Sequence, residues 1–126
     1  PDNVQWCQSQ GLDIRLMDIN ILPFKDKEFD SINMDNVLEH IEDPELILSE
    51  MDRVLKDNGI LIIGVPGTLG FTTAPDHEVY YSKEDLIKTF VNRGYKVQNV
   101  FAMPIEWDWL DSRMEQYCYY GVFKKG

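Results

Sequence analysis

Hydrophobic and polar positions along the chain follow two different periods. Short runs of alternating or wholly apolar residues predict β-strands, and apolar residues that recur every three or four positions predict amphipathic α-helices. The strand-like runs cover residues 13–18, 29–34, 60–65, 95–102 and 117–123. The two helical patterns begin at Asp43-Pro44 and at Ser82.

The first helical pattern is the clearest element in the sequence. The Asp43 side chain can accept hydrogen bonds from free amides of the first turn, and Pro44 supplies a preset φ. The pair Asn58-Gly59 predicts the end of this helix. The following run 60–65 is nearly all apolar, which is typical of a strand buried on both faces in a parallel sheet. Strand, helix and strand in this order predict a βαβ unit and an α/β fold.

The second half of the chain carries weaker signals. Ser82 and Asp85 resemble a capping box at the start of a helix that ends at Arg93-Gly94. The segment 66–75 is rich in Gly, Thr and Pro and predicts a loop, which we interpret as an active-site lid or substrate loop because it brings no Lys of a phosphate-binding loop. The segment 102–116 has no assignable period.

Composition restricts the class of protein. The 126 residues predict a single domain over 1–126, and a hydrophobic content of 44% suffices for a packed core. A net charge of −10 with only 12 basic residues argues against nucleic acids and anionic membranes as partners. Cys7 and Cys118 form no CxxC pair and no secretory leader is seen, so we expect a cytoplasmic protein with reduced thiols, although a disulfide between them stays open.

The order of several short motifs resembles the class I S-adenosylmethionine-dependent methyltransferases, especially small-molecule methylases of the ubiquinone and menaquinone type. The motifs are Asp18, LPF at 22–24, FD at 29–30, NVLEHIEDP at 36–44 and EMDRVLKDNG at 50–59. The resemblance covers roughly residues 11–103. It implies methyl transfer from S-adenosylmethionine to an oxygen, nitrogen or carbon nucleophile of a small molecule.

The resemblance also implies roles for five residues. Asp18 would accept a hydrogen bond from the adenine amino group, and the backbone amide of Ile19 would donate to the ring. Asp35 and Asn36 would face the methionine moiety, at the carboxyl ends of strands where open α/β sheets bind ligands. His40 would line the substrate cavity and could act as a general base.

Each of these residues also has a purely structural interpretation. Asp18 alone would be a turn residue, and Asp35 with Asn36 could simply form a loop that caps residues 37–40. His40 and His77 could both be structural histidines that bond to backbone. We predict no metal site: His40, His77 and nearby carboxylates could form one, but their spacing is not that of a zinc site.

The family pattern implies further strands that these residues do not contain. We therefore expect a partial Rossmann-like methyltransferase sheet of about five strands and two main helices, in which the N-terminal βαβ unit with its glycine-rich loop is missing. Buried strand edges are not left unpaired. Residues 13–18 could pair with 29–34, the edge could pair with another chain, or residues upstream of Pro1 could belong to the protein.

If the chain is complete, the short connection 19–28 favours an antiparallel pairing or a strand-exchanged homodimer. Two hypotheses follow from these observations. The first is a methyltransferase whose cofactor site is incomplete in this chain. The second is a noncatalytic methyltransferase-like module that self-associates or completes its sheet with another chain.

Overall fold

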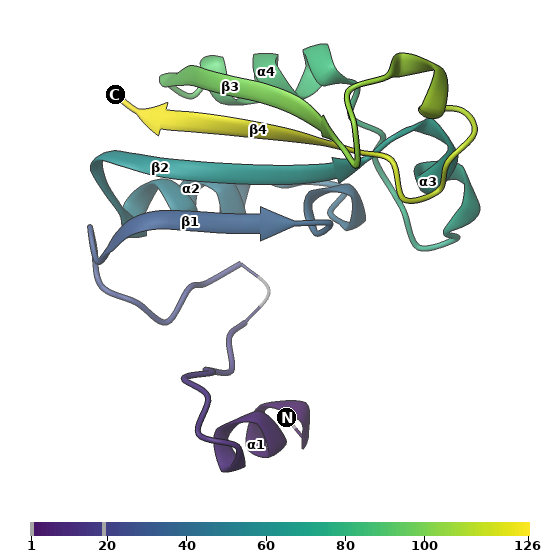
Figure 1. Ribbon diagram of the computed structural model, residues 1–126. Coiled ribbons are helices and arrows are strands. Elements are labelled where there is room, and N and C mark those ends of the chain that lie inside the picture. The colour runs from purple at the N-terminus through teal and green to yellow at the C-terminus, as the bar shows by residue number, and fades with distance from the viewer. Residues whose placement is uncertain (1, 19) are drawn as a thin grey trace.

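The computed structural model describes residues 2–18 and 20–126, and its centre is a four-stranded sheet in the order β1-β2-β4-β3 (Figure 1). The strands are β1 (Phe29–Asp35), β2 (Leu55–Pro66), β3 (Tyr95–Met103) and β4 (Cys118–Lys125). The helices are α1 (Asp2–Ser9), α2 (Glu45–Val54), α3 (Thr68–Thr73) and α4 (Lys83–Val91), with short 3-10 helices η1 (Leu38–His40) and η2 (Asp108–Leu110). β1 and β2 are parallel, whereas β4 is antiparallel to both of its neighbours.

One face of the sheet carries the hydrophobic core. Helices α2 and α4 both lie behind the sheet in Figure 1. Alternate residues of each strand point toward these helices, because side chains alternate across a strand. The core combines residues of both helices and of all four strands: Met34, Leu48, Met51, Leu61, Ile63, Leu86, Phe90, Tyr95 and Phe123. The α/β fold with a partial sheet is therefore confirmed.

The LPF segment is fastened to α2 by an ion pair on that helix. The Glu50 carboxylate accepts a hydrogen bond from the backbone N–H of Leu22 at 2.9 Å. The Arg53 guanidinium donates to the carbonyl oxygens of Leu22 at 3.0 Å and Phe24 at 2.8 Å, and it also binds Glu50 and Asp26. The two motifs that contain LPF and EMDR thus form one physical unit.

The prediction of a strand at 13–18 is wrong. Only an isolated bridge between Asp18 and Ile21 forms there, because a strand needs a neighbour to pair its backbone groups. The pairing of 13–18 with 29–34, which was one of the alternatives, does not form either, since residues 13–18 make no bridge to β1. Within the described ranges the other edge of β1 has no partner strand, and the sheet has four strands instead of about five.

Several boundaries differ from their predicted positions. Helix α2 ends at Val54, and Asn58 takes its positive φ of 62° inside a bulge at the start of β2. The predicted loop 66–75 contains the six-residue helix α3. Helix α1 was not predicted because it buries no residue and shows no apolar face; it lies away from the sheet in Figure 1.

The predicted positions of three strands and of one helix cap are confirmed. Strands β1, β3 and β4 lie within one or two residues of the expected ranges, and the capping box at Ser82 and Asp85 is present. Gly94, with φ of 91°, lies in the turn that follows α4. Cys7 and Cys118 are both free thiols. Among the described helices, none has the length and apolar character that crossing a membrane requires.

Candidate functional site

Three polar side chains, those of Asp35, Asn36 and Tyr120, meet at the carboxyl ends of β1 and β2, on the face of the sheet opposite the helices. Asp35 of β1, Gly64 of β2 and Tyr120 of β4 are neighbours in register. The Tyr120 hydroxyl donates to Asp35 Oδ2 at 3.2 Å, and the Asn36 amide donates to Asp35 Oδ1 at 3.0 Å. Burial and the Asp35 carboxylate raise the pKa of Tyr120 to about 12.

Asn36 turns the chain out of the sheet. Its φ of 52° lies in the left-handed region, which Asn tolerates better than most residues. The Asn36 N–H donates to the carbonyl of Gly64 at 3.0 Å, so the turn remains joined to β2. The chain then enters η1 with Glu39 and His40 at its end.

Glu39 is the one charged residue among the buried side chains described. Its exposed fraction is 1%, and burial raises the pKa of its carboxyl group. The Glu39 carbonyl accepts hydrogen bonds from the backbone N–H groups of Glu78 at 2.8 Å and Val79 at 3.0 Å. These bonds hold the segment before α4 against η1, and they place His77 beside Glu39.

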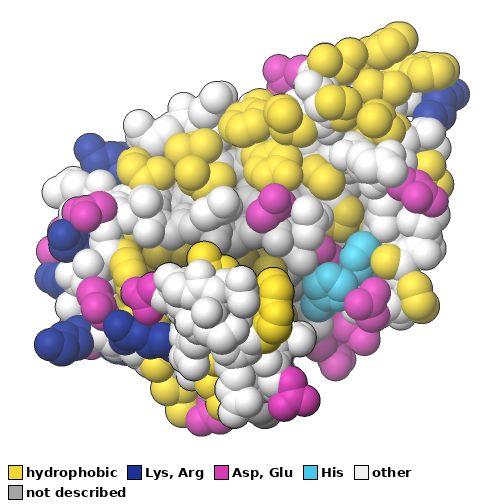
Figure 2. Space-filling model, turned by 60° about the horizontal axis from the view of Figure 1, so that its bottom comes forward, with side chains coloured by type: hydrophobic (Ala, Val, Ile, Leu, Met, Phe, Trp, Pro, Cys, Tyr) yellow, Lys and Arg dark blue, Asp and Glu magenta, His cyan; other side chains and the backbone are white. Residues whose placement is uncertain are grey.

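Two imidazoles face the Glu39 carboxylate. His40 Nε2 lies 3.6 Å and His77 Nε2 lies 3.8 Å from Glu39 Oε1, and the two ring centroids are 4.7 Å apart. His40 Nδ1 lies 3.0 Å from the carbonyl oxygen of Asp76, and His77 Nδ1 lies 3.0 Å from that of Phe71. Figure 2 shows the imidazoles as one patch with acidic side chains beside it.

An apolar pocket of about 450 Å³ adjoins His40 between β1 and α2. Its lining is apolar except for two residues, His40 and Asn33, and it comprises Met17, Leu22, Ile32, Asn33, Met34, Val37, His40, Ile41, Ile47 and Met51. Asp18 follows Met17 in the chain and is exposed. A pocket with apolar walls and few polar groups is the usual form of a small-molecule site.

The predicted site residues fall into two groups. Asp35 and Asn36 are hydrogen-bonded to each other, whereas His40 lies with Glu39 and His77, and no hydrogen bond between described residues joins the two groups. Asp18 lies in the segment before the sheet, and the Ile19 assignment lies outside the described residues.

Glu39 and Tyr120 were not predicted as site residues. Tyr120 could have been found from strand alternation, because residues 118, 120 and 122 share one face of β4 and this face includes the neighbour of Asp35. One feature of the sequence could have indicated that Glu39 is buried, because it is a carboxylate close to the apolar residues Leu38 and Ile41.

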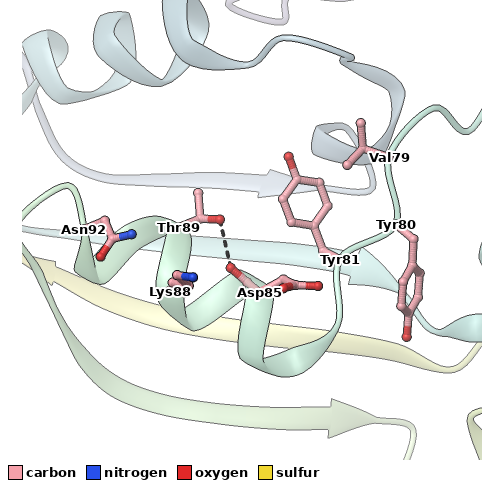
Figure 3. A pocket seen from close by; sticks show the side chains of 7 residues that line it. All are labelled: Val79, Tyr80, Tyr81, Asp85, Lys88, Thr89 and Asn92. Carbon is pink, nitrogen blue, oxygen red and sulfur yellow. Dashed lines mark hydrogen bonds between the residues drawn. The ribbon is translucent and has the colours of Figure 1, made fainter.

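A second cleft, of about 330 Å³, lies along α4 (Figure 3). Its lining residues are Val79, Tyr80, Tyr81, Asp85, Lys88, Thr89 and Asn92. Two of its polar residues bond to the helix itself: Asp85 completes the capping box, and the Thr89 hydroxyl donates to the Asp85 carbonyl at 2.8 Å.

Comparison with known proteins agrees with these features. The family described as "Methyltransferase domain" matches residues 2–63. A ubiquinone/menaquinone biosynthesis C-methyltransferase from Desulfotalea psychrophila is 38% identical over 50 residues, which are 40% of this chain and 20% of that protein. The matched segments thus represent only a minor part of the curated relatives.

Solved structures show the same fold. A SAM-dependent methyltransferase from Aquifex aeolicus superposes with a TM-score of 0.69 at 19% identity, over 97% of this chain and 61% of that chain. A SAM-dependent methyltransferase from Thermotoga maritima gives a TM-score of 0.70 at 19% identity, over 98% of this chain and 69% of that chain. The motif order, the four-stranded sheet with its helices and these matches agree, and together they support a class I S-adenosylmethionine-dependent methyltransferase.

Proposed function

We propose that this chain takes part in S-adenosylmethionine-dependent methyl transfer to a small-molecule acceptor, and that it supplies one side of the cofactor site and the wall of the acceptor pocket. The observation that carries the proposal is the apolar pocket of about 450 Å³ with His40 in its lining. The pocket suits an acceptor with an apolar body and one ionisable group near His40. The two free cysteines of the chain, Cys7 and Cys118, suit a reducing, cytoplasmic setting.

The residues present fit one part of the cofactor. The exposed Asp18 carboxylate can accept a hydrogen bond from an adenine amino group. Asp35 and Asn36 lie where a strand ends at the edge of an α/β sheet, and their side chains offer acceptors for the positively charged methionine end. The glycine-rich loop that the family pattern places before these elements is not among residues 1–126, so these residues would supply only one part of the site.

The bound methyl donor supplies an electrophilic methyl group, so the protein's part is mainly alignment and, for some acceptors, removal of a proton. His40 is suited to accept this proton, because its Nδ1 is held by the Asp76 carbonyl and its Nε2 keeps a lone pair. The Glu39 carboxylate, 3.6 Å from Nε2, would stabilise the imidazolium that forms.

Calorimetry with S-adenosylhomocysteine tests the proposal directly. We expect a saturable heat of binding at millimolar ligand. Circular dichroism should show that the chain is folded both before and after the ligand is added. A folded sample without heat at this concentration would rule out independent cofactor binding. That result would favour the second candidate function.

The second candidate is a noncatalytic module that completes its sheet with another chain, and the edge of β1 favours it. Over the described part of the chain, β1 has a strand neighbour on one side only, which leaves backbone donors and acceptors free to pair. A homodimer through this edge would satisfy them. Size-exclusion chromatography with light scattering tests the homodimer, and a monomer at all concentrations would contradict it.

A further inference from the structure

The buried carboxylate of Glu39 lacks hydrogen-bond partners. Neither Oε1 nor Oε2 has a hydrogen-bond partner among the residues that the structure describes, although the side chain is 1% exposed. Buried charges in proteins are normally paired or bound to a metal, because an unpaired one is strongly destabilised. Burial can be met by protonation, which the raised pKa of Glu39 favours, or by a cation bound to the carboxylate; the neighbouring side chains decide which partner fits.

The two neighbouring imidazoles do not offer a proton in their neutral form. His40 Nδ1 and His77 Nδ1 each lie 3.0 Å from a backbone carbonyl oxygen. A carbonyl oxygen only accepts, so each Nδ1 must carry the N–H, and each Nε2 must then be a lone pair. The lone pairs lie 3.6 and 3.8 Å from Glu39 Oε1. With Glu39 ionised, three acceptor atoms, Glu39 Oε1 and the two Nε2 atoms, thus lie close together with no donor between them.

We propose that Glu39, His40 and His77 bind a divalent transition-metal ion of the Zn²⁺ type. One ligand atom from each residue lies within 4.8 Å of the others. Bonds of about 2.1 Å in tetrahedral geometry place ligand atoms about 3.4 Å apart, so the two observed separations from Glu39 need to close by only a few tenths of an ångström.

The ligand chemistry selects the class of ion. Two imidazole nitrogens and one carboxylate oxygen are the ligand set of several catalytic zinc sites, whereas Mg²⁺ and Ca²⁺ prefer oxygen ligands only. The hydrogen bonds from each Nδ1 to a carbonyl are the outer contacts that usually orient metal-binding histidines. Asp76, whose Oδ2 lies 3.4 Å from His40 Nδ1, adds negative charge nearby.

The location of the cluster indicates what the ion can do. Three protein ligands leave a fourth position for water or for a ligand oxygen. His40 borders the apolar pocket, so a molecule in the pocket can approach the open position. The ion would use the lone pair of His40, so His40 could not then accept the proton; the ion would instead promote its loss by lowering the pKa of an acceptor hydroxyl bound to it.

Metal binding can be measured on the full chain without any methyl donor, so its outcome is independent of the proposed methyl transfer. We expect one Zn²⁺ per chain by calorimetry. Substitution of Co²⁺ should give two exchangeable, hyperfine-shifted proton resonances, one from each Nδ1–H, since the chain has only two histidines. His77→Gln should remove one of them.

Two ligand variants and one control decide the proposal. Glu39→Gln and His77→Gln should each weaken Zn²⁺ affinity by about 100-fold or more, since even outer contacts of a metal site change affinity about 10–100-fold. Glu78→Gln, an exposed acid in the same segment, should leave the affinity unchanged. If Glu39→Gln does not fold by circular dichroism, the partly exposed His77 decides alone. Absence of binding, or equal binding by wild type and folded His77→Gln, would overturn the site.

Discussion

The Tyr120 hydroxyl donates a hydrogen bond to Asp35 at 3.2 Å across the intervening strand, and this contact exists because residue 64 between them is glycine. A Cβ at position 64 would lie 2.3 Å from Asp35 Oδ1 and 2.5 Å from Tyr120 Cε1. The bond links the first and third strands in the spatial order of the sheet. It also holds Asp35 at the edge where we place the cofactor.

Gly64→Ala should therefore separate Asp35 from Tyr120 and destabilise the fold by about 1–3 kcal/mol, the usual cost of overpacking. The pKa of Tyr120 should fall from about 12 toward the ordinary tyrosine value of about 10. Urea denaturation and ultraviolet titration measure the two effects, with Tyr120→Phe to identify the signal. An unchanged tyrosine titration would show that the contact does not depend on Gly64.

Asp18→Ala should weaken S-adenosylhomocysteine binding by about 1–3 kcal/mol if its carboxylate accepts from the adenine amino group. Asp13→Ala is the matched control, because Asp13 is an exposed acid in the same segment and its ion pair with Arg15 is a long 4.0 Å contact. Calorimetry compares the affinities. Equal affinities for wild type and Asp18→Ala would remove the adenine assignment.

Local signals in the sequence predicted the elements that local interactions stabilise. The Ser82 capping box is a contact over three residues, and it forms as expected. The apolar run at 60–65 needs only a buried position between two strands, and β2 lies there. The strand at 13–18 failed because its backbone needs a neighbouring strand, which alternation within the segment cannot supply.

The candidate site was only partly predictable for a related reason. Asp35 and Asn36 follow a strand directly, so their position at the sheet edge follows from the local pattern. The Glu39 cluster depends on hydrogen bonds from Glu78 and Val79 that fold a distant segment back onto η1. The spacing of residues in the sequence does not predict the contact between residues 78–79 and Glu39. The two histidines therefore showed no metal-site pattern before the fold was known.

Arg93→Met should destabilise the protein by about 2 kcal/mol, because hydrogen bonds to charged groups are among the stronger ones. The Arg93 side chain is 15% exposed, and it joins the end of α4 to Glu45, Ser49 and Asp52 of α2. Lys27→Met is the control, since the Lys27 pair with Asp57 is 59% exposed on both sides and should contribute little. Equal urea midpoints for both variants would contradict the proposed bridge.

Ser82→Ala should cost about 1 kcal/mol, because the Ser82 hydroxyl accepts from the Asp85 N–H at 3.1 Å and satisfies a free amide of the first turn of α4. Ser82→Thr keeps the hydroxyl and should retain most of this stability. Thermal unfolding of the two variants and wild type gives the comparison. If Ser82→Thr lost as much stability as Ser82→Ala, the shape of the side chain at position 82 would matter more than its capping hydrogen bond.

Glu50→Gln should change how stability depends on pH. The hydrogen bonds from Arg53, and then the N–H of Leu22, lower the pKa of Glu50 from 4.5 to about 2. A carboxyl group whose pKa is lower in the folded state binds fewer protons there than in the unfolded state, so its contribution is complete above 4.5 and is lost as the pH falls toward 2.

The stability difference between wild type and Glu50→Gln should therefore be largest near neutral pH and shrink as the pH falls through this window. Urea midpoints at a series of pH values measure the difference, and Glu115→Gln, an exposed acid, serves as the control. The same contacts hold Leu22 and Phe24 on α2, so the LPF segment of the variant should exchange its amide hydrogens faster. A pH-independent difference would mean that Glu50 acts through packing alone, and that its charge does not fasten the LPF segment.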